Sequence, residues 1–142
     1  MSVDFGAAIR TALINDVVAA GLITEWEGEP AVFTRTPVPG DVLFPFVIVS
    51  PNIAYVDEGT LSDERPNVVR DIFVYGNQPD QYRVVETIAN RIQSLFHRTR
   101  FSITVAEYNI VLITASGPHQ APADDDKSVA RVVTLTILAQ RA

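Results

Sequence analysis

The sequence predicts an α+β domain in which two principal helices pack on a mainly antiparallel β-sheet. Two segments repeat apolar residues with helical spacing, and the runs around them have the alternation or the β-branched composition of strands. The connections are of hairpin or loop length, as antiparallel strands allow, although a right-handed parallel crossover around the second helix also fits the order. We find no internal repeat and no linker, and 142 residues suit one core, so residues 1–142 are expected to form a single domain.

The first expected helix covers residues 5–20. Ser2 or Asp4 can cap its start, and Gly21 marks its end. Its apolar positions are four residues apart and therefore share one face: Phe5, Ile9, Leu13 and Val17.

A short strand is expected next, at residues 31–35, after a turn at residues 25–30. Two prolines in residues 36–40 predict an extended loop, because proline cannot donate to a central ladder. Residues 46–50 form a nearly continuous apolar run that predicts a strand inside the sheet, buried on both faces and continuing toward Tyr55.

A polar loop is expected at residues 57–67, and a second strand follows at residues 68–75. Breaker residues 76–80 then precede an amphipathic helix at residues 82–97. The apolar residues of this helix share one half of its circumference at 100° per residue, which predicts a helix lying on a sheet: Tyr82, Val84, Val85, Ile88, Ala89, Ile92, Leu95 and Phe96.

The last third of the chain is expected to add a hairpin and a long closing strand. Phe101, Ile103 and Val105 alternate with polar neighbours, and residues 107–109 can turn the chain into a strand at residues 110–115. A second polar loop is expected at residues 116–127. The alternation of residues 128–140 predicts the closing strand.

The order of these segments resembles the tail completion or tail terminator proteins of long-tailed bacteriophages, which also occur in gene transfer agents. The resemblance covers nearly the whole chain by layout and spacing and includes no catalytic signature. Its points are the Phe44-Pro45-Phe46 opening of a hydrophobic strand, the strand Arg70 to Tyr75, the helix after it, and the final strand 129–140.

The resemblance implies a structural protein of the virion that caps the end of the tail tube as a ring of six subunits. Such a ring stops tube polymerisation and offers its other surface to the head-tail connector, while DNA passes through its lumen without specific binding. Residues 57–67, 116–127 and 36–43 are candidate docking segments. A neck or head-closure connector protein is the alternative within the same class.

Composition limits the other functions. The net charge of -6 is concentrated in residues 1–71, which carry four basic and eleven acidic side chains, against seven and six in residues 72–142. This balance disfavours a large phosphate-binding surface. The chain has no cysteine and no apolar run near the roughly 18 residues of a membrane span. The start of the sequence lacks the pattern of a signal peptide, so we expect a cytoplasmic protein that later joins the tail or neck of a virion.

The candidate metal and acid-base groups each have a simpler structural interpretation. Adjacent acids such as Asp124, Asp125 and Asp126 converge poorly on one cation and are typical of a solvated loop. His97, with Arg98 and Arg100 after it, complements the negative end of a helix. His119 lies in a predicted Gly-Pro loop without a recognisable nucleophile.

Two further groups of charged residues are candidate sites. Glu25, Glu27 and Glu29 surround Trp26, and this arrangement favours a surface loop with an aromatic anchor over paired catalytic carboxylates. A local basic patch is the second hypothesis, and it involves Arg70, Arg98, Arg100 and Arg131.

The alternative functional class is a small α+β enzyme or ligand-binding module. It requires a pocket with convergent polar groups, whereas the sequence contains no motif with a known mechanism. We therefore expect a protein that is not an enzyme, without catalytic, cofactor-binding or metal-binding residues and without a cofactor.

Overall fold

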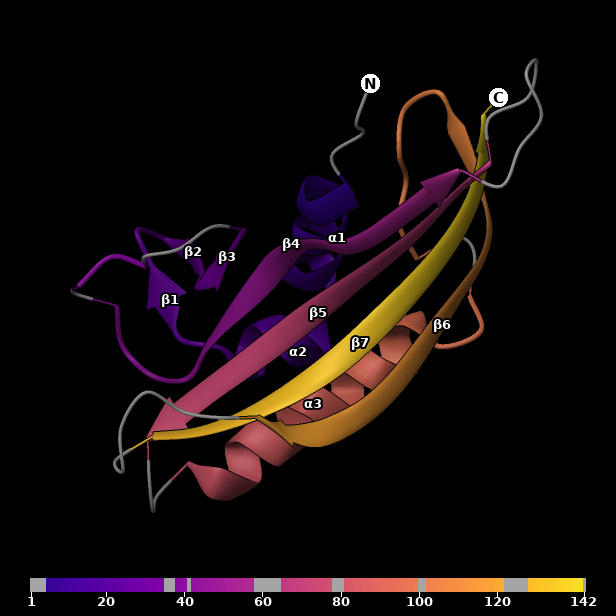
Figure 1. Cartoon of the computed structure of the whole chain (residues 1–142). Helices are drawn as coiled ribbons and strands as arrows, with labels where there is room; N and C mark the ends of the chain where they lie inside the picture. The colour runs from indigo at the N-terminus through magenta and orange to yellow at the C-terminus, as the bar shows by residue number, and fades with distance from the viewer. Residues whose placement is uncertain are drawn as a thin grey trace.

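A computed structural model describes residues 5–34, 38–40, 42–57, 65–77, 81–99, 102–121 and 128–141 (Figure 1). In these residues, helices lie against one face of a five-stranded sheet with the order β3-β4-β5-β7-β6. All neighbouring strands of this sheet are antiparallel except β3 and β4, which are parallel. The predicted α+β class with a mainly antiparallel sheet is confirmed. The helices are α1 (Phe5–Asn15), α2 (Val17–Leu22) and α3 (Tyr82–Phe96), and the strands of the sheet are β3 (Val32–Phe33), β4 (Phe46–Asp57), β5 (Pro66–Asn77), β6 (Tyr108–Ala121) and β7 (Ser128–Arg141).

The expected single helix over residues 5–20 is wrong, because the chain breaks at Asp16. The backbone of Asp16 is extended, and its carboxylate accepts a hydrogen bond of 3.0 Å from the Ala19 amide, which starts α2. Gly21 consequently lies inside α2, which ends at Leu22. The expected caps, Ser2 and Asp4, lie outside the described residues.

A small hairpin follows the helices. Strands β1 (Glu25–Trp26) and β2 (Glu29–Pro30) pair antiparallel around a turn in which Glu27 and Gly28 both have positive φ, 52° and 82°. The predicted turn at residues 25–30 is confirmed, and the predicted strand at 31–35 is shorter, at Val32–Phe33.

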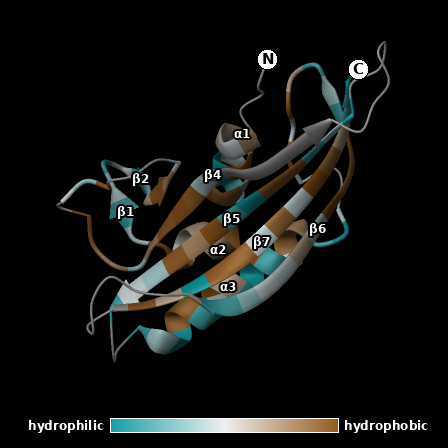
Figure 2. Cartoon of the chain, in the orientation of Figure 1, coloured by the Kyte–Doolittle hydropathy of each residue, from teal (hydrophilic) through white to brown (hydrophobic). Residues whose placement is uncertain are grey.

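The centre of the sheet is the continuous ladder between β5 and β7, which runs from the pair Asn67–Leu138 to the pair Asn77–Ser128 without a bulge. Along β5 the burial alternates strictly, so that Val68, Ile72 and Val74 face the helices. Figure 2 shows the apolar residues concentrated along these central strands. This register places the hydrophobic core between the sheet and the helix layer.

Helix α3 matches the predicted amphipathic helix. Its buried residues all belong to the predicted apolar face: Val85, Ile88, Ala89, Ile92 and Phe96. Tyr82, which the same pattern assigned to that face, is instead 50% exposed, and the Arg131 guanidinium carbon lies 5.4 Å from its ring centre. Strands β5 and β6, before and after α3, run in the same direction with β7 between them, so a parallel crossover surrounds this helix.

The predicted hairpin over residues 101–115 is wrong in its first arm. Residues 103–105 form no strand, although Ile103 and Val105 are buried in the core. Alternating burial also arises in an irregular segment that crosses a core, so this pattern was not specific for a strand. Phe101 lies outside the described residues.

The predicted loop over residues 116–127 is wrong in its first half, because β6 continues to Ala121. The register shifts between Ser116 and His119, and Gly117 adopts φ of 108° at this bulge. A Cβ atom on Gly117 would lie 2.8 Å from the Val132 carbonyl oxygen, so the position requires glycine. Glycine and proline therefore mark a bulge inside a strand. Residues 122–127 lie outside the described part.

The other predicted loop, residues 57–67, is shorter than expected. Strands β4 and β5 continue to Asp57 and from Pro66, and they pair with each other up to these two residues. The connection therefore joins two long antiparallel neighbours.

Candidate assembly surfaces

One face of the sheet is not covered by the helices, and we call it the open face (Figure 1). It is formed by the alternate side chains that point away from α1 and α3, and most of them are half-buried or exposed. Cross-strand pairing brings these side chains into rows, of which Ile48, Phe73, Val132 and His119 form one. The other main members are Phe46, Val69, Asp71, Tyr75, Thr134, Thr136, Leu138, Leu112, Thr114 and Ser116.

The open face contains few charges. Among the side chains that the structure describes there, Asp71 is the one charged group, and its carboxylate accepts a hydrogen bond of 2.6 Å from the Thr134 hydroxyl. The strand arginines point to the other side of the sheet, because they pair in register with residues that face the helices. The described part of the open face is therefore nearly neutral, although the chain carries a net charge of -6.

Aromatic rings gather at one end of the open face. Successive ring centroids are 5.2 to 6.3 Å apart, within the range of favourable aromatic pairs. The cluster joins β1, β3, β4 and β5, so the predicted role of Trp26 as an aromatic anchor agrees with its packing on Phe33. Its members are Trp26, Phe33, Phe44, Phe46, Phe73 and Tyr75.

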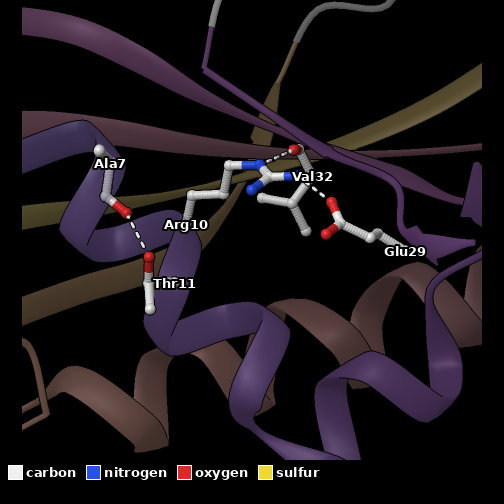
Figure 3. Close-up of polar contacts among 5 residues, drawn as sticks. All are labelled: Ala7, Arg10, Thr11, Glu29 and Val32. Atoms are coloured by element: carbon white, nitrogen blue, oxygen red, sulfur yellow. Dashed lines mark hydrogen bonds and ion pairs between the residues drawn. The ribbon is translucent and has the colours of Figure 1, made fainter. Parts of the chain in front are cut away.

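Arg10 connects the helix layer to this end of the sheet (Figure 3). Its Nε atom donates to the Val32 carbonyl at 2.8 Å, and its Nη2 atom lies 3.1 Å from a carboxylate oxygen of Glu29. Glu29 is thus engaged in an ion pair. This ion pair ties the hairpin that carries Glu25, Glu27 and Glu29 to α1.

A second ion pair lies within the helix layer. The Asp16 carboxylate receives two hydrogen bonds from Arg91 of α3, at 2.7 and 2.9 Å, in addition to the bond from the Ala19 amide. The hydrogen bonds from Arg91 are the main cause that lowers the pKa of Asp16, and the same contact raises the pKa of Arg91. The sequence pattern missed this pair because its members are 75 residues apart.

Of the four arginines considered for a basic patch, the three that the structure describes do not form one. Arg70 is 7% exposed and donates to the Ser50 carbonyl at 2.8 Å, and Arg131 forms an ion pair with Glu86 of α3. Both therefore lie between the sheet and the helices. Arg98 is exposed just after α3, and Arg100 lies outside the described residues.

His97 has a structural role. It follows α3, where its amide donates to the Gln93 carbonyl, and its Nδ1 atom accepts a 3.0 Å hydrogen bond from the Ala115 amide of β6. His119 is exposed on β6 after the bulge. No group of three His, Cys, Asp or Glu residues that is suited to a metal occurs in the described part of the chain. Asp124, Asp125 and Asp126 lie outside it.

A groove of about 660 Å³ lies between α1 and the segment 102–106, next to Leu95. Alanines and short polar side chains line it, including Thr11, Ser102 and Thr104. Its one carboxylate, Asp16, is already bound by Arg91. The lining residues do not combine a nucleophile with a base.

Comparison of this chain with known proteins shows a similarity in fold. No family model and no curated protein sequence matches the chain. The fold is similar to that of a chain in the solved structure of the virion of a native gene transfer agent (GTA) particle, with a TM-score of 0.73 and 16% identity. The similarity covers 96% of this chain and 93% of that chain. The two chains therefore share one fold over nearly their full lengths.

No helix in the described part of the chain combines the length and the apolar character needed to cross a membrane.

Proposed function

We propose that the chain is a structural protein of a phage-like particle and that it caps the end of the tail tube as a ring. The observation that carries this proposal is the fold shared with a virion chain over 96% of this sequence. The layout of segments, which resembles tail terminators, supports the finer role. The ring stops addition of tube subunits and forms the surface to which the head attaches. Residues 1–142 act in it as one domain.

The partners in this proposal are further copies of the chain, the tail tube protein and the head-tail connector protein. A ring of six subunits requires heterologous contacts, in which two different surfaces of each subunit meet and the rotation closes. Function then rests on complementary surfaces, without catalysis, cofactor or metal. The subunits are made in the host cytoplasm and end in the tail or neck of the virion.

The open face supports an assignment of the lumen. DNA binding depends mainly on cationic side chains that neutralise phosphates. Among its described side chains, the open face carries Asp71 and no cation. A lumen lined by this face allows DNA to pass without retention.

Negative-stain microscopy and pull-down with tail tubes test the proposed role. The purified chain is expected to form rings and to bind tube ends, and tubes assembled in its presence are expected to stop growing. Binding to the connector without binding to tubes supports the neck or head-closure role instead. Failure to bind either partner and to form rings contradicts the proposal.

A further inference from the structure

The two edges of the sheet differ in how far they are covered. On the β6 edge, the end of α3 and the residues just after it form hydrogen bonds with the middle of the strand. The Ile113 amide donates to the Thr99 carbonyl at 2.7 Å, and the Ala115 amide donates to His97 Nδ1 at 3.0 Å. Gln93 Nε2 donates to the Ala115 carbonyl at 3.3 Å. A foreign strand therefore cannot pair with this part of β6.

The end of β6 after the bulge also has backbone groups that point away from β7. Ile113 and Ala115 lie opposite Ile137 and Leu135 of β7, and both turn their amides away from β7. Gln120 lies opposite Arg131, which has the same parity along β7. Because hydrogen-bonded and non-hydrogen-bonded pairs alternate, the Gln120 backbone also points outward.

Among the described residues, another strand pairs with the β4 edge only near its start. Strand β3 pairs with Val47 and Ile48, and no described strand pairs with β4 beyond them on this side. Val68 lies opposite Tyr55 on one side and Ile137 on the other. Because the backbone of Ile113 points away from its partner Ile137, the backbone of Ile137 points toward β5, and that of Val68 points toward β7. The Tyr55 backbone therefore points away from β5, to the free side.

We infer that the end of β6 in one copy pairs with the free part of β4 in the next copy, so that one sheet continues around the ring. This inference rests on the proposed ring. Three antiparallel steps separate β4 from β6, so these strands run in opposite directions. A neighbour's β6 beside β4 then continues the antiparallel alternation. The contact joins two different edges and is heterologous, as closure by rotation requires.

The positions of the two free segments fit a closed sheet. Gln120 lies in one row with Arg131 and Val74, whereas Tyr55 lies in a row with Val68. The two rows are six residues apart along β5, from position 74 to position 68. A shift of six residues over four strands, at about 3.4 Å per residue and 4.8 Å per strand, tilts the strands by about 45°. Closed barrels have strand tilts of about 35 to 45°.

A proline at position 120 tests this pairing. Gln120→Pro removes one outward amide and leaves the ladder to β7 intact, while Gln120→Ala removes the same side chain and keeps the amide. In native mass spectrometry, wild type and Gln120→Ala are expected to give the ring mass. Gln120→Pro is expected to lose that mass while its thermal unfolding midpoint stays near that of Gln120→Ala. Normal rings from Gln120→Pro overturn the inference.

Hydrogen exchange on the wild-type ring gives a second readout, which does not depend on folding of the proline variant. The outward amides of residues 54–57 are expected to be protected in the ring. Exchange there at the rate of an unstructured peptide overturns the edge pairing and leaves the ring itself standing. Absence of wild-type rings, both alone and on tail tubes, overturns the proposed function and this inference together.

Discussion

At the scale of single residues, Asp16 holds the helix layer together through two contacts. Its carboxylate caps α2 and binds Arg91, so replacement by alanine removes both contacts, whereas asparagine retains the cap. We expect Asp16→Ala to be less stable than Asp16→Asn by about 1 kcal/mol, the usual effect of losing a cap. Urea unfolding of the two variants measures the difference. Equal midpoints contradict the capping role.

The ion pair of Asp16 also gives a pH dependence with a defined sign. The Arg91 hydrogen bonds lower the pKa of Asp16 in the folded state below its ordinary value of 3.8. A lowered folded pKa favours folding above the unfolded value, and this contribution is lost as pH falls through the folded pKa. The excess stability of wild type over Asp16→Asn should therefore be constant from pH 7 to about 5 and shrink below about pH 4. A difference that grows on acidification contradicts this assignment.

Two glycines offer a matched pair of alanine substitutions. A Cβ atom at Gly76 would overlap Cγ2 of the buried Val85, whereas a Cβ atom at Gly21 in α2 would have no heavy atom within 4 Å. Overpacking predicts that Gly76→Ala destabilises the fold by about 1 to 3 kcal/mol. Gly21→Ala should instead stabilise it by about 0.5 to 1 kcal/mol, because alanine is the better helix former. Shifts of the denaturant midpoint in opposite directions, relative to wild type, test the pair.

At the scale of elements, α3 packs its inner face against the sheet. Ile92 is fully buried on its inner face, and Asn90 on the same helix is exposed. Ile92→Ala is expected to lower the free energy of unfolding by about 2 to 5 kcal/mol. Asn90→Ala, the control, should change it by less than about 0.5 kcal/mol. An unchanged urea midpoint for Ile92→Ala excludes the core assignment.

The elements that the sequence predicted well are those whose burial is repeated and one-sided. The inner face of α3 and the alternation of β7 follow from contacts with a single core, which the 3.6-residue and 2-residue periods report directly. The periodicity did not predict the break at Asp16, because it reports neither the side-chain cap on the Ala19 amide nor the contact with Arg91, 75 residues away. At Gly117 and Pro118 the same residues that end strands elsewhere form a bulge, and only pairing with β7 distinguishes the two outcomes.

The surfaces were harder to predict than the core. Sequence alone left Arg70 and Arg131 as candidates for a basic patch, because it does not show which side of a strand meets a helix. Both arginines lie on the helix side, so the described part of the open face is nearly neutral. The edges of the sheet likewise depend on strand order, which brings β7 between β5 and β6 against the order of the chain.

At the scale of the whole molecule, the nearly neutral open face predicts that an assembled ring does not retain DNA. Thr136 lies on this face between Val69 and Thr114, and Thr136→Lys adds one cation per subunit there. Rings of this variant are expected to retain DNA at low salt and release it as salt rises, because retention depends on counterion release. Thr87→Lys, at an exposed position on α3, is the control. Equal DNA retention by both variants contradicts the assignment of the open face to the lumen.

In the proposed role, this chain ends tail-tube growth and prepares the tube for the head. A cap adds no length to the tube but removes the free end at which subunits add, since heterologous contacts that do not close continue indefinitely. Electron microscopy of particles from which the gene is deleted tests this role. We expect heads that are filled or fillable beside unjoined tails of abnormal length. Joined particles with tails of ordinary length would contradict it.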